Sequence, residues 1–284
     1  LGKGVKWMQR SEITEGFVDA AIPFIKKARQ GNKPFYINLW PDDVHTPFWP
    51  PVEQWKDGSK RQLFLSVLEE MDRQLGKLFD HIRNNPDLAD NTLILACSDN
   101  GPEKGAGVAG PFRGYKTHLY EGGIRSSLVA WAPKLMNKEV QGTINKKSIF
   151  SAIDLVPTLL EITGTNAPKN VNFDGESLPD ILLGKSNGSR KQDILFRRPP
   201  DRDSFYDVKD LPDLAIRSGK WKLLCEYDGS DALLYDLTQD RGEKNNLALK
   251  HPKIVKQLSQ KVIAWHKSMP PDNGPQMIGN TKRK

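Results

Sequence analysis

The sequence predicts an α/β fold in which a mixed sheet is covered by helices on both faces, followed by a small C-terminal α+β subdomain. Short apolar runs with little polar alternation indicate strands buried on both faces. These runs occupy residues 35–40, 92–98 and 127–131. Helical patterns separate them, as in a layered α/β domain. Near residue 192 shorter strand candidates and turn residues take over, so we expect residues 1–190 to belong to the α/β domain and residues 191–284 to form the subdomain.

Three helices are expected in the larger domain. Ser11 is placed to cap a helix through about Arg29, in which Pro23 predicts a kink or an early stop. The clearest helical pattern runs from about Arg61 to Arg83, with apolar residues three and four positions apart. Its expected buried stripe consists of Leu68, Met71, Leu75, Leu78 and Ile82. A further helix is expected from about Ser151 to Ile162.

The C-terminal subdomain is predicted from four short strands and one helix. The strand candidates are residues 194–197, 214–217, 221–226 and 233–237. Ser218-Gly219-Lys220 is a tight connection between the two middle strands, so residues 214–226 are predicted to form a β-hairpin. An amphipathic helix from Pro252 to about Lys267 completes the subdomain.

The composition argues against two classes of function. The 284 residues hold 42 Lys and Arg against 35 Asp and Glu, a net charge of +7. This excess is not concentrated in the way that nucleic-acid binding requires, so no nucleic-acid partner is expected. No apolar run approaches the roughly 20 residues of a membrane span, so no span is expected either. The sequence opens at Leu1 without a signal segment, and we expect it to be a processed product or a fragment.

Two loops that follow predicted strands carry the candidate functional residues. Asp99 and Asn100 come directly after the strand at 92–98, and His45 lies in the loop after the strand at 35–40. An acidic and an amide oxygen at a strand end are typical ligands of a hard cation such as Ca²⁺. Asp-Asn-Gly is also favourable turn chemistry, so a capped turn is the alternative. The long glycine-rich segment that follows, residues 101–123, carries Arg113, Lys116 and His118, which indicates an anion site.

Together these segments resemble the sulfatases of the alkaline phosphatase superfamily. The resemblance rests on several blocks in the same order, which makes it far more specific than any one block. The blocks are Pro34–Tyr36 with His45–Pro47, Ser98–Glu103, Lys116 with Tyr120–Arg125, Ile153–Leu160, Ala215–Leu223, Leu234–Leu237 and Glu243–Ala248. The run Gly110–Lys116 is most similar to enzymes that act on N-acetylgalactosamine-6-sulfate or related glycan sulfates, and arylsulfatase A-like enzymes share the motifs.

The resemblance implies a role for each candidate residue. Asp99 and Asn100 match two of the four ligands of a divalent cation, usually Ca²⁺. Lys116 matches a lysine that contacts a sulfate oxygen, and His45 a histidine that protonates the leaving alcohol. Arg113 and His118 are assigned to the substrate subsite, with a surface role as the alternative. Glu121 and Arg125 belong to the same signature and are read as structural.

The resemblance also implies that the nucleophile lies outside this sequence. The family uses a formylglycine made from the first residue of a Cys/Ser-x-Pro/Ala-x-Arg motif, and neither Cys97 nor Cys225 begins one. Both cysteines are instead expected to be buried thiols in apolar strands. The N-terminal part of the same protein is therefore expected to complete the site, and this chain alone is expected to be inactive.

Two other functions stay open at this point. A phosphate or phosphonate ester hydrolase of the same superfamily would use Ser or Thr as nucleophile, and a non-catalytic fragment would only bind a sulfated glycan. The expected substrate is a sulfated carbohydrate, and the resemblance implies a periplasmic, secreted or lysosomal location.

Overall fold

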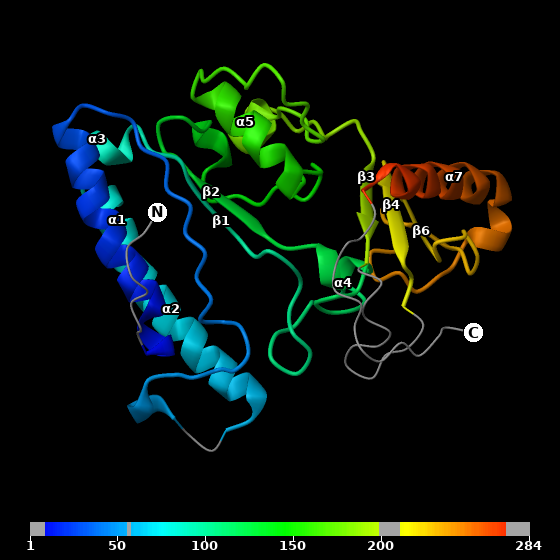
Figure 1. Cartoon of the computed structure of the whole chain (residues 1–284), viewed down its shortest axis with the longest axis horizontal. Helices are drawn as coiled ribbons and strands as arrows, with labels where there is room; N and C mark the ends of the chain where they lie inside the picture. Colours follow the sequence, from blue (N-terminus) through cyan, green and yellow to red (C-terminus); the bar gives the residue numbers. More distant parts are fainter. Residues whose placement is uncertain (1–8, 56–57, 199–210, 271–284) are drawn as a thin grey trace. The chain divides into compact units, whose positions relative to one another are not determined.

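The computed structural model describes residues 9–55, 58–198 and 211–270 (Figure 1). Within these residues the chain divides into two compact units. The first takes the residues up to Ile94 together with Gly105–Gly107 and Trp131–Lys138. The second takes Leu95–Lys104, Val108–Ala130 and the residues from Glu139 onward. These units do not coincide with the expected division at residue 190, which stays a prediction.

The first unit is built on two long helices, α1 (Ile13–Gln30) and α2 (Lys60–Arg83), with the short α3 (Pro86–Ala89). Apolar side chains of all three helices form one core, made by Val18, Ala21, Ile25, Leu78, Ile82 and Leu88. A 3-10 turn, Arg10–Glu12, precedes α1, so Ser11 does not cap this helix as predicted. Pro23 lies inside α1 without ending it. Ser59 caps α2 in a reciprocal arrangement with Gln62, which explains the sharp start of this helix.

The buried face of α2 differs from the predicted stripe. The buried residues are Val67, Glu70, Gln74, Leu78 and Ile82, whereas Leu68 is 36% exposed. Gln74 accepts a hydrogen bond from the backbone N–H of Glu15 at 2.7 Å and donates one to the carbonyl of Ser11 at 2.6 Å. These bonds satisfy backbone groups at the start of α1. The face is therefore set partly by polar contacts that apolar periodicity does not report.

The predicted strand at residues 35–40 is not a strand. Phe35, Ile37 and Leu39 pack against the α1–α2 core, while Tyr36 and Trp40 are 70% and 76% exposed. The alternation is that of a strand with one buried face. However, none of the strands described elsewhere in the chain pairs with this segment.

The predicted strands at 92–98 and 127–131 are present as β1 (Ile94–Cys97) and β2 (Leu128–Trp131), which form a two-stranded sheet. The expectation that they are buried on both faces is wrong, because their residues are half-buried or exposed, with Val129 61% exposed. In the second unit, α5 (Leu155–Ile162) follows a 3-10 turn, and α6 (Pro179–Leu182) precedes the C-terminal sheet. Among the described residues no helix is both long enough and apolar enough to cross a membrane.

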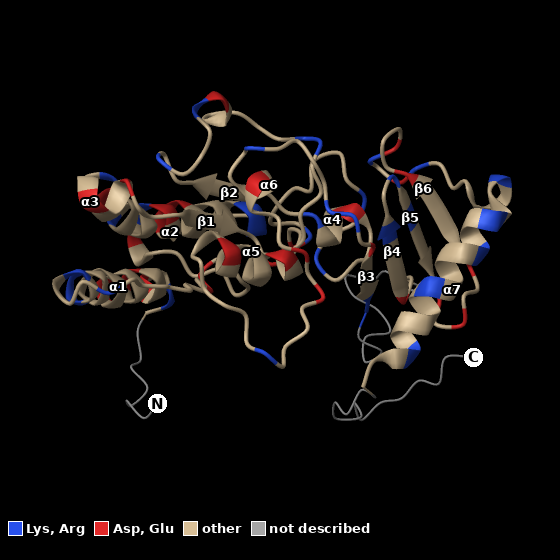
Figure 2. Cartoon of the chain, turned by 90° about the horizontal axis from the view of Figure 1, so that it is seen from above, with Lys and Arg blue, Asp and Glu red and all other residues tan. Residues whose placement is uncertain are grey.

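The C-terminal sheet agrees closely with the sequence prediction. Its strands are β3 (Ile194–Arg197), β4 (Leu214–Ser218), β5 (Trp221–Cys225) and β6 (Leu233–Asp236), antiparallel in that order. Helix α7 (Pro252–Ser268) covers one face, where Leu258 and Val262 pack on Leu214, Ile216 and Leu223 (Figure 2).

The opposite face of this sheet is also covered. Ala215, Leu224 and Tyr235 point to this side and pack against Leu119 and Tyr120. These two residues directly precede the short helix α4 (Glu121–Ile124). The segment that carries Lys116 therefore lies against the C-terminal sheet.

Candidate functional site

The turn after β1 holds Asp99 and Asn100 in place through neighbouring serines. The hydroxyl of Ser98 donates to the carbonyl of Asn100 at 2.8 Å, and the hydroxyl of Ser126 donates to the carbonyl of Ser98 at 2.8 Å. Asp99 is exposed and Asn100 is half-buried. The turn is therefore closed by side chains other than those of the two candidate ligands.

The side-chain oxygen of Asn100 fits a cation ligand. The amide nitrogen of Asn100 donates to Asp99 Oδ1, whereas Asn100 Oδ1 is buried and has no hydrogen-bond partner among the described residues. A buried oxygen without a donor carries a desolvation cost that a bound cation would remove. The described residues contain no group of three or more His, Cys, Asp or Glu able to hold a metal ion. The pair thus fits as part of a ligand set rather than as a complete site.

Three glycines bring the two sides of the loop at 101–123 into backbone contact. Gly101 donates its N–H to the carbonyl of Gly123 at 2.8 Å, and Gly122 donates to the carbonyl of Arg113 at 2.7 Å. A Cβ on Gly101 would lie 1.8 Å from the Gly122 oxygen. A Cβ on Gly123 would lie 2.1 Å from the carbonyl oxygen of His118. Close backbone approach, not unusual dihedral angles, is the reason that these positions are glycine.

Lys116 lies on this loop, and its backbone is held in place there. Its backbone N–H donates to the carbonyl of Pro102 at 2.9 Å, which fixes the main chain close to the Asp99–Asn100 turn. Its side chain is half-buried and has no hydrogen bond or ion pair with any residue that the structure describes. A lysine whose backbone is fixed in this way, and whose ammonium group has no partner among the described residues, is suited to bind an anion.

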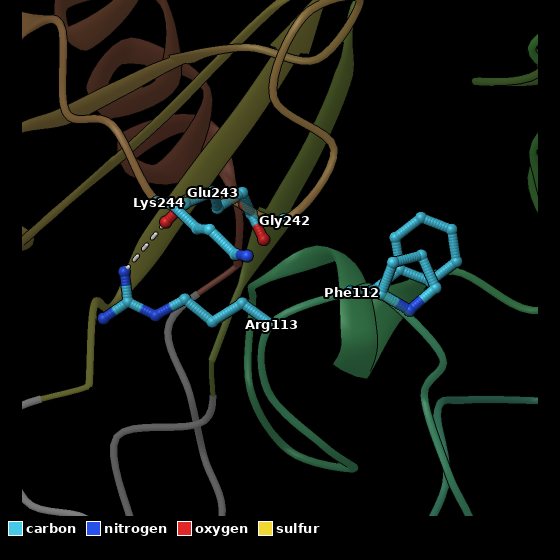
Figure 3. Close-up of a pocket in the computed structure, with 6 residues that line it drawn as sticks. Phe112, Arg113, Gly242, Glu243 and Lys244 are labelled. Carbon is cyan, nitrogen blue, oxygen red and sulfur yellow. Dashed lines mark hydrogen bonds between the residues drawn. The ribbon is translucent and has the colours of Figure 1, made fainter.

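Arg113 has several partners within the protein. Its guanidinium donates to the hydroxyl of Tyr235 at 3.2 Å and to the carbonyl of Glu243 at 3.3 Å, and it lies 4.0 Å above the ring of Tyr120. Beside it is a shallow pocket of about 510 Å³ lined by Pro111, Phe112, Arg113, Gly242, Glu243 and Lys244 (Figure 3). In Figure 3 the guanidinium of Arg113 points toward the carbonyl of Glu243. These contacts hold its guanidinium within the protein, and its expected role in substrate binding stays a prediction.

His118 is buried, with only 6% of its surface exposed. Its ring lies edge-on to the rings of Tyr115 and Tyr120, at 6.3 and 6.4 Å between centroids. Burial lowers the pKa of His118, and the nearby cations Arg198, Arg113 and Lys104 lower it further, so the ring is neutral at neutral pH. A neutral buried ring is suited to packing, and its predicted contact with substrate stays a prediction.

His45 belongs to the first unit, whereas the other candidates belong to the second. Arg10 donates to the carbonyl of His45 at 3.0 Å, and Thr14 donates to the buried Asp43 at 2.6 Å, so α1 and the 3-10 turn before it position the loop. The Nδ1–H of His45 donates to the carbonyl of Thr46 at 2.8 Å. This bond occupies Nδ1, so Nε2 is the nitrogen of the exposed ring that can meet a second hydrogen-bond partner.

The sequence did not single out Lys222 and Glu243, two buried charged residues behind the loop. Lys222 is 0% exposed and lies 3.0 Å from carboxylate oxygens of both Glu121 and Glu243. The sequence feature that could have indicated them is the lysine inside the apolar strand predicted at 221–226. Such a residue requires a buried partner of opposite charge.

The prediction that both cysteines are buried is wrong for Cys97, which is exposed, and is confirmed for Cys225. Burial raises the pKa of Cys225 to about 12, and the nearby carboxylates of Glu226 and Asp213 add to this.

We expect Ellman's reagent at pH 8 to modify one thiol per native chain and a second only after unfolding, because the thiolate is the reactive form. Cys97→Ser should abolish the native reaction. Two rapid equivalents in the native chain would contradict the assignment.

The chain thus carries an Asp-Asn pair at a strand end, suited to a cation, and a lysine on a glycine-built loop, suited to an anion. A sulfatase profile matches residues 7–165, more than half of the chain, and a profile described as N-sulphoglucosamine sulphohydrolase, C-terminal, matches residues 112–268. The chain belongs to the sulfatase family.

Individual relatives agree with this assignment. The chain is 27% identical to an N-acetylgalactosamine-6-O-sulfatase of Bacteroides thetaiotaomicron, over 91% of this chain and 52% of that protein. It is 29% identical to human arylsulfatase A, over 82% of this chain and 49% of that protein. The crystal structure of Ps i-CgsB in complex with k-i-k-neocarrahexaose superposes with a TM-score of 0.77 at 27% identity, covering 93% of this chain and 56% of that one. The chain thus spans about half the length of the curated relatives that it matches.

Proposed function

We propose that this chain supplies the cation-binding and sulfate-binding side of a sulfuric ester hydrolase that releases inorganic sulfate from a sulfated sugar or glycan. The observation that carries the proposal is that the buried Oδ1 of Asn100 and the ammonium of Lys116, neither of which has a side-chain partner among the described residues, lie on one backbone-linked loop. The oxygen of Asn100 is suited to bind a cation, and the ammonium of Lys116 is suited to bind an anion. A sulfate ester bound through a metal ion meets both requirements.

Asp99 and Asn100 are the residues proposed to hold a divalent cation, with Ca²⁺ as the proposed ion because both donors are oxygen atoms. When bound, such a cation supplies neutralisation of sulfate charge and a fixed orientation for the reacting groups. The exposed carboxylate of Asp99 is open to it, and the Asn100 amide is already oriented by its bond to Asp99.

Lys116 is proposed to bind a sulfate oxygen and to stabilise the charge that develops there as the S–O bond breaks. His45 is proposed to act as a general acid. Protonated at Nε2, it would donate that proton to the oxygen of the departing alcohol and return to the neutral form. Arg113 and His118 are proposed to shape the sugar subsite through the loop at 113–118.

The attacking residue is proposed to be a formylglycine in an N-terminal part of the same protein. The half-length coverage of the relatives supports this proposal. The name of the B. thetaiotaomicron relative and the run Gly110–Lys116 favour an N-acetylgalactosamine-6-sulfate type of substrate. A periplasmic, secreted or lysosomal location completes the proposal.

The test is sulfate release from an aryl sulfate and from N-acetylgalactosamine-6-sulfate. We expect turnover by the protein that carries the preceding segment and none by these 284 residues alone. Release from a phosphate ester instead would favour a phosphoesterase, and binding of sulfated glycan without turnover would favour a non-catalytic role. Clear turnover by the 284 residues would refute the claim that the nucleophile lies elsewhere.

Replacing Lys116 tests its role within that assay. Lys116→Ala is expected to lower kcat by about 100- to 1000-fold, the usual loss when one group that stabilises transition-state charge is removed. Lys138→Ala is the matched control, because Lys138 is an exposed lysine outside the loop, and it should leave kcat unchanged. A Lys116→Ala variant with the kcat of the wild type would remove this residue from the mechanism.

A further inference from the structure

Lys222 is a lysine enclosed within the second unit. It lies in β5, and none of its surface is exposed. Its ammonium is 3.0 Å from Glu121 Oε1 and 3.0 Å from Glu243 Oε1, and these two carboxylates are themselves 2% and 0% exposed. An ammonium removed from water in this way persists only if its partners stay in place.

Two arginines complete the charge balance around this lysine. Arg125 and Arg217 approach the second oxygen of Glu121 at 3.3 and 3.5 Å. Burial opposes the charge on Glu121, but Lys222, Arg217 and Arg125 outweigh it and lower the pKa of this carboxyl group. Burial raises the pKa of Glu243, against the attraction of Lys222. Glu121 is thus held ionised, and Lys222 donates a hydrogen bond to its Oε1 at 3.0 Å.

The same cluster fixes the start of α4. The backbone N–H of Glu121, the first residue of this helix, donates to Glu243 Oε2 at 2.7 Å. Arg113, at the other end of the loop, donates to the carbonyl of Glu243 (Figure 3). Both ends of the segment 113–121 are therefore bound to the stretch around Glu243, which is 122 residues away from Glu121 in the sequence.

The glycines of α4 extend this attachment to the candidate ligands. Gly123 accepts a hydrogen bond from Gly101, the residue next to Asn100, and a Cβ on Gly123 would lie 2.4 Å from the carbonyl of Tyr115, the residue next to Lys116. Gly122 donates to Arg113 at 2.7 Å. The backbone of α4 therefore contacts the immediate neighbours of Asn100 and of Lys116.

We propose that Lys222 is a positioning residue: through Glu121 and Glu243 it fixes α4 on the C-terminal sheet, and α4 in turn sets the positions of Lys116 and Asn100. The C-terminal sheet is then part of the scaffold of the site. The inference rests on the proposed function only in taking Lys116 and Asn100 as ligands of sulfate and cation. The physical attachment can be measured without any substrate.

The experiment compares amide hydrogen exchange of the 284-residue chain and its variants, followed at Gly101, Lys116, Gly122 and Gly123, whose N–H groups bond within the loop. Lys222→Met leaves two buried carboxylates without their shared cation, and exchange at these amides should rise about a hundredfold. Lys220→Met is the matched control. Lys220 lies on the same hairpin, but its side chain is 51% exposed and pairs with Asp236, so the loop should keep its exchange rates.

A second pair of variants separates charge from simple filling of space. Glu243→Gln keeps an oxygen for the Glu121 N–H and removes one charge, and a rise of about tenfold is expected. Because Arg217 and Arg125 still balance Glu121, Lys222→Met combined with Glu243→Gln should recover most of the protection lost in Lys222→Met. If Lys222→Met does not fold, exchange at the same four amides in Glu243→Gln alone tests the inference.

Unchanged exchange in the loop of Lys222→Met or of Glu243→Gln would overturn the inference and leave the proposed hydrolase activity standing. A double variant as unprotected as Lys222→Met would also overturn it, because Lys222 would then only fill space. Absence of sulfate release from the whole protein would count against the proposed function and would not alter these exchange rates.

Discussion

Gly101→Ala is expected to destabilise the second unit by about 3 kcal/mol or more, among the larger effects of a single substitution. The added Cβ would lie 1.8 Å from the oxygen of Gly122, 2.8 Å from its carbonyl carbon and 2.9 Å from Cα of Gly123. All three are backbone atoms, so no side-chain rotation relieves the overlap. The hydrogen bond from Gly101 N–H to the Gly123 carbonyl would be lost as the two segments separate.

Gly76→Ala provides the matched control, because a Cβ at this position in α2 meets nothing within 4 Å. Alanine is the better helix former by about 1 kcal/mol, so this variant should be slightly more stable than the wild type. Urea denaturation followed by far-UV circular dichroism measures both. A Gly101→Ala chain as stable as Gly76→Ala would show that the two backbone segments are not in contact.

The contact of Gly101 with Gly122 and Gly123 also links two residues with different proposed roles, Asn100 and Lys116. Gly101 follows the candidate cation ligand Asn100, and Gly122 and Gly123 follow Tyr120 in the signature of the family. The sequence presents these as two separate blocks. The structure joins them through backbone atoms, so loss of one glycine disturbs the placement of both Asn100 and Lys116.

The elements that the sequence predicted well are those whose burial is apolar and local. The strands at 194–197, 214–218, 221–225 and 233–236 and the helix Pro252–Ser268 lie within a residue or two of their predicted bounds. Each is specified by apolar residues at a regular period and by nearby turn residues. The placement of Asp99 and Asn100 after a strand followed from the same reasoning.

The predictions that failed depended on partners distant in the sequence. The segment at 35–40 has the apolar content of a strand, but a strand also requires a neighbour, which composition cannot supply. The buried face of α2 includes Gln74 because Ser11 and Glu15 need hydrogen-bond partners. The Lys222 cluster joins residues about a hundred positions apart, and no local pattern indicates which charges meet.

Asp154→Asn is expected to cost about 3–5 kcal/mol of unfolding free energy, the range for removing one partner of a buried ion pair. Asp154 and Arg190 have side chains 0% and 1% exposed. The two oxygens of Asp154 accept from Arg190 Nη2 at 3.1 Å and Nε at 3.2 Å. They also accept from the backbone N–H groups of Glu176 and Ser151, both at 2.8 Å.

Four donors therefore converge on one carboxylate, and asparagine offers a single oxygen. Its NH₂ group would face a donor on the other side, and the buried charge of Arg190 would keep only the more distant carboxylate of Glu176, at 3.8 Å, among its described ion-pair partners. Asp193→Asn is the control, because the Asp193–Lys261 pair is 18% and 51% exposed, and its loss should cost less than about 1 kcal/mol.

Arg190 also donates to the carbonyls of Gln192 and Asp193, just before β3. Loosening by Asp154→Asn should therefore reach the edge of the C-terminal sheet, which faster amide exchange at Ile194–Arg197 would reveal. Equal denaturation midpoints for the two variants would mean that the Asp154–Arg190 pair does not bind the start of α5 to that edge.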